Sequence, residues 1–463
     1  MRRPDRSPDQ PPPPGPAGRE TGSLGEALAW LDRHINLEAI EAGRAGRSAL
    51  PTLDRIAALT SAMGEPEKTF PVVHITGTNG KGSTTRICST LLHTNGLSVG
   101  TYTSPHLERL NERIAWNGKP ITDDDLRDCL FAIEKLEEFI CRADPSSLSP
   151  TWFELMTASA YRYFGDVAVD AAVIEVGLGG RYDATNVADA DVAVVTNVQL
   201  DHVNILGDTR VKIASEKAGI LKPGCIAVIG EQDDEVVSVF ANEARQVGVD
   251  GFWRRGIEFE CTENVVAHGG RVISVRTPGA AYDDLFLPLY GAHQGENASA
   301  AIAAAEAFFG APVDPDVVAE AISHVTAPGR LEIVARRPLV LLDGAHNAAG
   351  AAALSASLDE DFSVIERMVV VFGCLNGHDP AELLGALDPD RVAHVVACTP
   401  PSLRAVPAAE VAAAAESIGL EVSVADSVAD AIDEARTIAA PEDLVLVTGS
   451  LYLVGAARLY LSE

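Results

Sequence analysis

Residues 74–84 combine residue types that can hold a phosphate group. Glycines in this segment let a backbone approach an anion closely, and Lys81 adds a positive charge. An apolar run precedes the segment and a helix-like run follows it, so we expect a strand that turns through glycines into a helix. Such a turn directs several N–H groups and the positive end of the helix dipole at one point. We therefore expect a nucleoside triphosphate to bind at Gly77, Thr78, Asn79, Gly80, Lys81, Gly82 and Ser83.

The spacing of this loop departs from the common phosphate loop G-x-x-x-x-G-K-S/T. Gly77 and Gly80 are three residues apart, and Gly82 separates Lys81 from the hydroxyl of Ser83. A chance turn rich in glycine, asparagine and serine is the alternative interpretation. The order of strand, glycines, lysine, hydroxyls and helix favours phosphate binding. The loop alone does not separate a kinase, an ATPase and a ligase.

Two further expected strands end in residues that can bind a metal ion. Glu175 closes an apolar strand, where an acid is costly unless it is paired or bound to metal, and a glycine-rich exit follows it. His202 follows the next strand along the chain. Because ligands bind at the carboxyl ends of parallel strands, Glu175 and His202 are candidates to share a Mg²⁺ ion. The alternatives are a salt bridge from Glu175 to an arginine and a structural role for His202.

Lys217 lies among small and apolar residues at 213–220. Burial would lower the pKa of its amine and favour the neutral, nucleophilic form. A solvated lysine on a helix is the alternative. Lysine is used sparingly in this chain, with none after Lys222, which favours a chemical role for Lys81 and for a lysine of the later cluster.

Composition limits the class of protein. At 463 residues the chain is too long for one ordinary core, which indicates two or three domains. A net charge of −30 argues against nucleic acid or an anionic membrane as partner, because phosphate groups need basic surfaces. We expect no membrane span and no secretory signal. Seven scattered cysteines without a C-x-x-C pair are typical of a reducing cytoplasm, where we expect the protein to act on small molecules.

Short apolar runs alternate with longer amphipathic segments, which predicts an α/β fold with a mostly parallel sheet. Strands are expected at 71–76, 169–176, 192–197 and 226–230, a small antiparallel insertion at 251–290, and a helix at 297–310. A second α/β series has expected strands at 339–342, 368–372, 392–397 and 444–448. We expect a disordered proline-rich tail at 1–22, an ATP-binding domain at 23–328 and a Rossmann-like domain at 329–463.

Nine motifs in this order resemble those of folylpolyglutamate synthase/dihydrofolate synthase, the folate branch of the Mur ligase superfamily. They are the loop at 77–83, SPHL at 104–107, EVGLGGRYDATN at 175–186, the run 196–202, EKAG at 216–219, His293-Gln294 with Asn297, PGRLE at 328–332, DGAHN at 343–347 and TGS at 448–450. The resemblance covers roughly residues 25–463. It implies an N-terminal ATPase domain, a C-terminal Rossmann-like domain and an active site between them.

The resemblance also implies roles for individual residues. Ser104, Glu175 and His202 would bind two Mg²⁺ ions, and Lys217 would carry a carbamate that binds the second. K⁺ is a further candidate ion. Residues that would contact ATP from the interdomain side are Asn297, Arg330, Asp343 and His346. Residues that would line a pterin pocket are Thr151, Trp152, Phe153, Glu154, Tyr182, Asp183 and Ala184. Core packing on a helix explains Trp152 and Phe153 equally well. The family favours a monomer.

One residue departs from the family pattern. His378 stands where the family usually carries the lysine of an Asp-Lys-Asp run. The contact made by that lysine, and with it the affinity for glutamate, is therefore in question.

The implied chemistry is ATP-dependent amide formation. A carboxylate of 7,8-dihydropteroate or of a (tetrahydro)folate would take the γ-phosphate, with Lys81 and two Mg²⁺ ions neutralising charge. L-Glutamate would then attack the acyl phosphate, while closure about a hinge at 328–332 excludes water. The alternatives are another Mur-type ligase with a non-folate acceptor, a phosphate-loop regulatory protein, and a kinase or simple ATPase.

Overall fold

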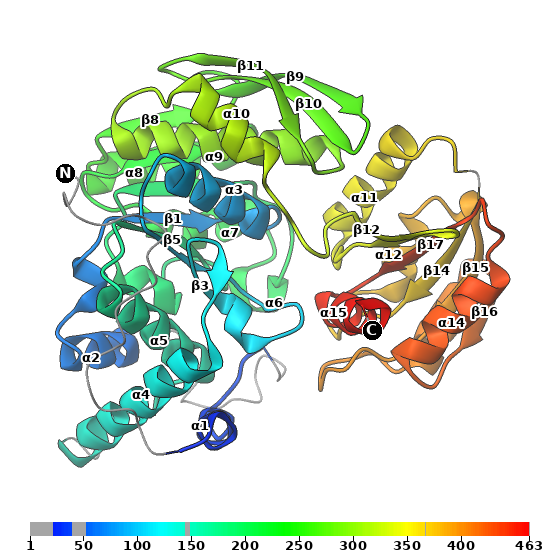
Figure 1. Ribbon diagram of the computed structural model, residues 1–463, viewed down its shortest axis with the longest axis horizontal. Helices are drawn as coiled ribbons and strands as arrows, with labels where there is room; N and C mark the ends of the chain where they lie inside the picture. The colour runs from blue at the N-terminus through cyan, green and yellow to red at the C-terminus, as the bar shows by residue number, and fades with distance from the viewer. Residues whose placement is uncertain (1–21, 39–51, 144–148, 366, 463) are drawn as a thin grey trace.

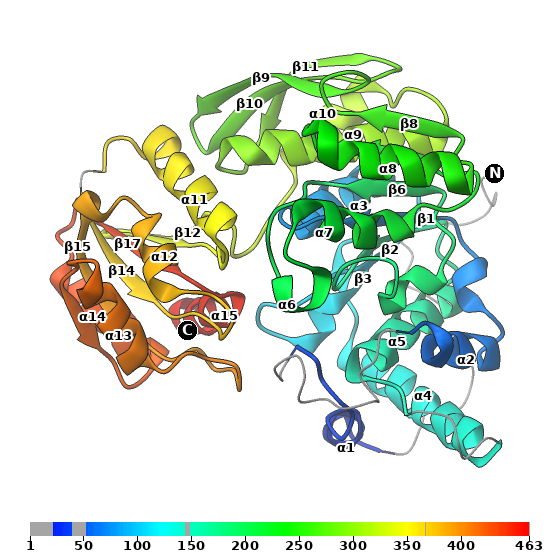
Figure 2. The same cartoon turned by 180° about the vertical axis from the view of Figure 1, so that it is seen from behind.

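A computed structural model describes residues 22–38, 52–143, 149–365 and 367–462. The tail expected at 1–22 lies outside these residues, apart from Gly22. Two α/β bodies lie side by side, and a small third sheet covers the outer side of the N-terminal body (Figures 1 and 2). The fold class expected from the sequence is confirmed.

An eight-stranded sheet forms the centre of the N-terminal body, in the order β4-β3-β2-β5-β1-β6-β7-β8. Its strands are β1 (Val72–Thr76), β2 (Val99–Tyr102), β3 (Ile114–Trp116), β4 (Lys119–Pro120), β5 (Ala171–Glu175), β6 (Val192–Val195), β7 (Ile226–Ile229) and β8 (Gly251–Arg254). From β2 to β8 all neighbours are parallel, and β3 and β4 add an antiparallel edge. Because β1 lies between β5 and β6, the residues that follow these three strands meet at one edge.

Helices cover both faces of this sheet, which explains why its strands read as continuous apolar runs. On one face, Val73 and Ile75 of β1 pack in the core formed with α3 (Lys81–Thr94), α9 (Ala292–Phe309) and α10 (Pro315–Ser323). The opposite face packs against the remaining helices of the body. These are α1 (Leu24–Leu31), α2 (Asp54–Ala62), α4 (Asp123–Ala143), α5 (Trp152–Asp166), α7 (Arg210–Lys217) and α8 (Asp234–Val247), with the short α6 (Val203–Leu206) beyond the sheet edge.

The antiparallel insertion is confirmed, but its expected start was wrong. Strands β9 (Glu260–Ala267), β10 (Gly270–Arg276) and β11 (Ala281–Leu287) form the small sheet. Residues 251–254 instead form β8, which pairs in parallel with β7 and extends the main sheet. A half-buried edge strand with aromatic residues has the same local pattern as a hairpin strand, so the sequence did not reveal which sheet it joins.

The C-terminal body contains a six-stranded sheet in the order β12-β13-β17-β14-β15-β16. Its strands are β12 (Glu332–Arg336), β13 (Leu339–Leu342), β14 (Met368–Phe372), β15 (Val392–Ala397), β16 (Val422–Val424) and β17 (Leu444–Thr448). Only β12 runs antiparallel to its neighbour among these described strands. Helices α11 (Ala348–Asp361), α12 (Pro380–Gly385), α13 (Ala408–Ser417), α14 (Val428–Ile438) and α15 (Leu451–Ser462) pack on its two faces. The four strands expected here have the predicted bounds.

The seven cysteines are all free thiols, as their scattered positions predicted. Among the helices that the structure describes, none is long and apolar enough to cross a bilayer.

Candidate active site

The phosphate loop, residues 77–83, connects the central strand β1 to the N-terminus of α3. Gly80 is the N-cap of α3 and has a φ of 82°, in the left-handed region that glycine adopts without strain. A Cβ at this position would lie 2.3 Å from Oδ1 of Asn297, which is buried on α9. Glycine is therefore required here both by backbone conformation and by the close approach of Asn297.

A second loop, residues 196–202, follows β6 and holds the phosphate loop in place; we call it the partner loop. The backbone N–H of Thr78 donates to the carbonyl of Asn197 (2.9 Å), and the N–H of Asn79 donates to Asn197 Oδ1 (3.0 Å). Asn197 Nδ2 and Thr196 Oγ1 both donate to the carbonyl of Asn79, at 3.0 and 2.6 Å. The N–H of Gln199 donates to Thr78 Oγ1 (2.9 Å). These bonds hold the phosphate loop in position from one side.

Two lysines converge on the same carbonyl of the phosphate loop. Lys81 Nζ donates to the carbonyl oxygens of Gly77 and Thr78, both at 3.1 Å, and Lys217 Nζ donates to that of Gly77 at 2.8 Å. Lys217 is only 3% exposed. Burial, together with the nearby Lys81 ammonium, lowers the pKa of Lys217 to about 7. The solvated alternative for Lys217 is therefore wrong, and a large share of its amine is neutral near neutral pH.

Glu175 lies beside Ser104 at the end of β5. The backbone N–H of Ser104 donates to Glu175 Oε2 (3.2 Å), and burial raises the pKa of this carboxyl against the charges of Lys81 and other cations. Both residues line a cavity of about 60 Å³ between the two bodies, beside Gly82 and Ser83 of the phosphate loop.

Two arginines line the same cavity from opposite bodies. Arg86 belongs to α3, and Arg330 comes from the segment that leads into β12. Burial lowers the pKa of Arg86, while the charge of Glu175 opposes that effect. A buried cation with incomplete compensation favours an anionic ligand. The cavity therefore presents two guanidinium groups and the carboxylates of Glu112 and Glu175 beside the phosphate loop.

His202 lies at the end of the partner loop, next to Asp201. Its side chain is 37% exposed, and Nε2 lies 3.9 Å from Asp201 Oδ1. Burial and the Lys81 ammonium lower the pKa of His202, while Asp201 opposes them. The imidazole is therefore neutral at neutral pH, which is the form that binds a metal.

Asn347, the N-cap of α11, joins the two bodies. Its Nδ2 donates to Asp201 Oδ2 (3.0 Å) and to Asn79 Oδ1 (3.1 Å), and its Oδ1 accepts from Asn79 Nδ2 (3.3 Å). The same Oδ1 accepts the helix-capping bond from the N–H of Gly350 (2.8 Å). One residue of the C-terminal body thus contacts both the phosphate loop and the partner loop.

Asp343 organises the facing loop of the C-terminal body. Its carboxylate accepts from the N–H of Leu331 (3.0 Å) and the N–H of Ala345 (2.8 Å). Burial raises the pKa of Asp343, and the charge of Arg330 opposes this. A Cβ on Gly344 would lie 2.8 Å from Arg330 Nη1, so the guanidinium lies directly over this glycine.

His346 and His378 are in contact, with ring centroids 5.9 Å apart. Nδ1 of His346 donates to the carbonyl of Gly344 (2.9 Å), and burial lowers the pKa of His346 to about 4. Burial would raise the pKa of Asp201, but its electrostatic interactions with His202, His346 and His378 and the bond from Asn347 more than offset it. The position where the family usually carries lysine therefore lies close enough to Asp201 of the other body to interact with it electrostatically.

The residues expected to line a pterin pocket have structural contacts of their own. Thr151 and Glu154 form the capping box of α5, and Glu154 also pairs with Arg55 (2.8 Å). Trp152 is buried and donates from Nε1 to Asp32 (3.2 Å), while the Phe153 ring lies 6.0 Å from that of Tyr102.

The second expected pterin segment forms the turn after β5. Asp183 accepts from the N–H groups of Leu178 (2.9 Å) and Thr185 (3.0 Å), Ala184 is buried, and Tyr182 is 51% exposed. Contact of either segment with a pterin remains a prediction.

Comparisons with known proteins show the family to which the chain belongs. Residues 153–305 match the Mur ligase middle domain, and residues 329–451 match the Mur ligase glutamate ligase domain. The chain is 39% identical to a dihydrofolate synthase/folylpolyglutamate synthase of Mycobacterium tuberculosis over 88% of this chain and 89% of the relative. The chain belongs to the Mur ligase family, in its dihydrofolate synthase/folylpolyglutamate synthase branch.

Solved structures of this branch have the same fold. The structure of Mycobacterium tuberculosis folylpolyglutamate synthase complexed with ADP and AMPPCP superposes with a TM-score of 0.88 at 37% identity, covering 95% of this chain and 98% of that one. E. coli FolC in complex with DHPP and ADP gives a TM-score of 0.82 at 31% identity, covering 96% and 98%.

Within this family, the metal expectation can be tested against the chemistry of the side chains. Mg²⁺ prefers oxygen ligands, and Ser104 and Glu175 line one cavity beside the phosphate loop. The raised pKa of Glu175 marks a carboxylate that a cation would stabilise. In the described part of the chain, no three His, Cys, Asp or Glu side chains converge on one point. The residues therefore fit an ion whose remaining ligands are oxygens of nucleotide phosphates and of water.

The sequence alone did not identify several polar residues of this site individually. Asp201 and Asn347 lay inside quoted motifs, and an asparagine directly before an alanine-rich helix is a capping signal. Arg86 follows the phosphate loop by one helical turn.

Proposed function

We propose that this protein is an ATP-dependent ligase that adds L-glutamate to 7,8-dihydropteroate, to the γ-carboxyl group of a (tetrahydro)folate, or to both. ADP and phosphate are the other products. The observation that carries this proposal is the cavity between the bodies, where the phosphate loop, Glu175, Ser104 and Arg330 meet. The name of the Mycobacterium tuberculosis relative and the DHPP in the E. coli structure support a pterin-containing acceptor.

The first chemical step makes an acyl phosphate. An oxygen of the acceptor carboxylate attacks the γ-phosphorus of ATP, and the bond to the leaving ADP oxygen breaks. The N–H groups of residues 77–83 hold the phosphates, and Lys81 with the guanidiniums of Arg86 and Arg330 offsets their charge. Asn297, Asp343 and His346 complete the nucleotide site in this proposal.

The second step forms the amide. The neutral amine of L-glutamate attacks the acyl carbon, loses a proton and displaces inorganic phosphate. Water would hydrolyse the acyl phosphate, so the two bodies must exclude it. We propose 23–328 and 329–463 as the two domains, with the hinge at 328–332 between α10 and β12.

We propose two positions for Mg²⁺ in this site. Ser104 and Glu175 would hold one ion, and His202 with a carbamylated Lys217 would hold the second. A bound Mg²⁺ supplies Lewis-acid neutralisation of the transferring phosphoryl group. For Lys217, the neutral amine adds CO₂ and releases one proton, and the product is an anion. The pKa of about 7 supports this reaction. K⁺ is proposed as an additional ion.

Further parts of the proposal concern substrate, location and assembly. Thr151 to Glu154 and Tyr182 to Ala184 would line the pterin pocket. A net charge of −30 and free thiols support a cytoplasmic enzyme of small molecules, without nucleic acid or membrane partners. We propose a monomer, which light scattering at working concentration tests directly.

The experiment that tests the function uses two acceptors side by side. The protein is incubated with ATP, Mg²⁺, L-glutamate and either dihydropteroate or tetrahydrofolate, and ADP release and product mass are measured. We expect glutamate-dependent ADP release and a product heavier by one glutamyl residue with at least one acceptor. ADP release without glutamate would instead indicate a kinase or simple ATPase. If no ADP is released with either acceptor, the alternative function, a Mur-type ligase with a non-folate acceptor, is favoured.

A further inference from the structure

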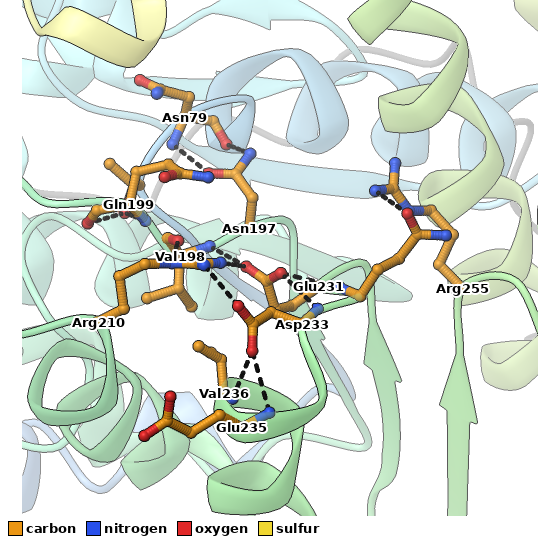
Figure 3. Close-up of polar contacts among 12 residues, drawn as sticks. Asn79, Asn197, Val198, Gln199, Arg210, Glu231, Asp233, Glu235, Val236 and Arg255 are labelled. Atoms are coloured by element: carbon orange, nitrogen blue, oxygen red, sulfur yellow. Dashed lines mark hydrogen bonds and ion pairs between the residues drawn. The ribbon is translucent and has the colours of Figure 1, made fainter.

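The peptide groups of Val198, in the middle of the partner loop, are held on both sides by charged side chains that have no role in the proposed chemistry (Figure 3). The N–H of Val198 donates to Glu231 Oε2 (2.9 Å). Arg210 Nε donates to the carbonyl of Val198 (2.8 Å). The same guanidinium pairs with Glu231 (2.9 Å) and Asp233 (2.8 Å). We call Arg210 and Glu231 the brace.

The brace is built as a rigid unit. The Glu231 side chain is 8% exposed, and its Oε1 also accepts from the N–H groups of Gln232 (2.9 Å) and Asp233 (3.0 Å). Burial would raise the pKa of Glu231, but these N–H groups, that of Val198 and the Arg210 guanidinium more than offset it, and the pKa is lowered. Glu231 is thus an ionised carboxylate with four donors, which fixes its orientation.

Val198 lies between Asn197 and Gln199, the two residues that hold the phosphate loop. Asn197 bonds to Thr78 and Asn79, and Gln199 bonds to Thr78. A shift of the Val198 backbone would therefore move both contacts together. The far end of the partner loop carries Asp201 and His202.

Arg210 has a second route to the phosphate loop. It is the first residue of α7, and Lys217, the last residue of that helix, donates to the carbonyl of Gly77 (2.8 Å). Arg210 therefore ties α7 and the partner loop to the same carboxylates of Glu231 and Asp233. Both elements that contact the phosphate loop from this side are therefore attached to the brace.

We propose that Arg210 and Glu231 are positioning residues for phosphoryl transfer, because they fix the partner loop and α7 against the phosphate loop. The proposal deepens the proposed function and rests on nucleotide binding at residues 77–83. Misplacement of a reacting group by about 1 Å costs on the order of 100-fold in rate, so loss of the brace lowers turnover without any direct contact to substrate. A brace that only stabilised the fold would change the stability and leave turnover of the folded protein intact.

The test compares Arg210→Met and Glu231→Gln with Lys212→Met as matched control. Lys212 lies on the same helix two residues on, and its exposed ammonium pairs with Asp208 (2.7 Å) away from both loops. Circular dichroism fixes a temperature at which every variant is folded. There, kcat and the acceptor KM of glutamate-dependent ADP release and the Kd of AMPPCP are measured.

We expect the two brace variants to lower kcat at least about tenfold and to weaken AMPPCP binding about fivefold, with the acceptor KM little changed. The control should remain within about twofold on each measure. Because both residues hold the backbone of the same residue, Val198, the double variant should be no worse than the more damaged single one. Hydrogen exchange of residues 196–202 should accelerate in the brace variants and not in the control.

Unchanged kcat and AMPPCP affinity in folded Arg210→Met and Glu231→Gln would overturn the proposal, as would losses that multiply in the double variant. If Arg210→Met does not fold, Arg210→Lys takes its place. Its single ammonium cannot bridge Val198 and two carboxylates at once, so the same losses are expected. A wild-type protein without ligase activity would contradict the proposed function, while AMPPCP affinity and hydrogen exchange would still decide on the brace.

Discussion

The two parallel sheets present carboxyl edges of different construction to the cavity between them. At the N-terminal edge, the phosphate loop is bonded to the partner loop, and the partner loop is bonded in turn to the brace (Figure 3). At the C-terminal edge, Asp343 accepts from two backbone N–H groups, His346 belongs to the same loop, and Arg330 comes from the segment before β12. The first edge is held by successive layers of polar contacts, whereas at the second edge the carboxylates of Asp343 and Glu332 bond directly to the backbone of the segments they hold.

This difference indicates that the two bodies have different tasks in the reaction. Phosphate binding needs N–H groups fixed in advance, since reorganisation during the reaction costs rate. Groups that close over a substrate must instead be able to form and lose contacts across an interface. Asn347 makes such a cross-contact to both loops of the first edge.

Glu175→Gln should have the largest effect. The amide keeps the shape but loses the charge that we expect to hold Mg²⁺, so kcat should fall by about 1,000-fold or more. The free energy of unfolding should stay equal or rise, because a buried carboxylate with a raised pKa is removed. Turnover and urea denaturation measure the two quantities. Retention of most of the activity would mean that Glu175 serves only in a salt bridge.

Lys217 should make the stability of the first edge depend on pH. Its folded pKa of about 7 lies below the ordinary value of 10.5, so between these values the unfolded state binds the extra proton. Stability from this group therefore rises with pH above the folded pKa. The difference in unfolding free energy between wild type and Lys217→Met should grow by about 2 kcal/mol between roughly pH 7 and pH 9. Urea unfolding in CO₂-free buffer tests this, with Lys212→Met as control; a flat difference would contradict the lowered pKa.

Asn347→Ala should uncouple the two edges. It removes the bonds to Asn79 and Asp201 and leaves a buried carboxylate short of a donor, so kcat/KM should fall about tenfold. The lost helix cap also costs about 1 kcal/mol of stability. Ser427→Ala is the control, because it removes the N-cap of α14 without a cross-body bond. Equal kinetics in both variants would show that the cross-contact is not used.

Arg458→Met should have the smallest effect. Arg458 pairs with Glu332 of its own body (2.9 Å) and with Glu108 of the other, and its side chain is 30% exposed. Ion pairs with this exposure contribute about 0–1 kcal/mol and weaken with salt. At about 0.5 M salt, turnover should remain within about twofold of that of the wild type. A tenfold loss of turnover would show that the ion pair of Arg458 at the edge of the interface matters as much as the contacts of Asn347.

The strands that the sequence located best are those whose burial is decided locally. Strands β13, β14, β15 and β17 are short apolar runs buried between helices, and their bounds were predicted correctly. β8 was assigned to the wrong sheet, because an edge strand shows only half a pattern and its partner lies elsewhere in the chain. The same limit applies to the site. Lys217 was recognised from apolar neighbours in sequence, whereas Arg210 meets Glu231 only through folding.

By itself, the sequence determined the family, the phosphate loop and the residue types that can carry the chemistry, because these depend on side chains at close spacing. The tertiary structure alone decided which of those groups meet. The carbonyl of Gly77 accepts from both lysines, Asn347 bonds to Asp201 across 146 positions, and the brace joins the first residue of α7 to the segment between β7 and α8. The physical reason is that a pKa, a hydrogen bond and a fixed orientation depend on neighbours in space, and the parallel sheet brings those neighbours together from distant parts of the chain.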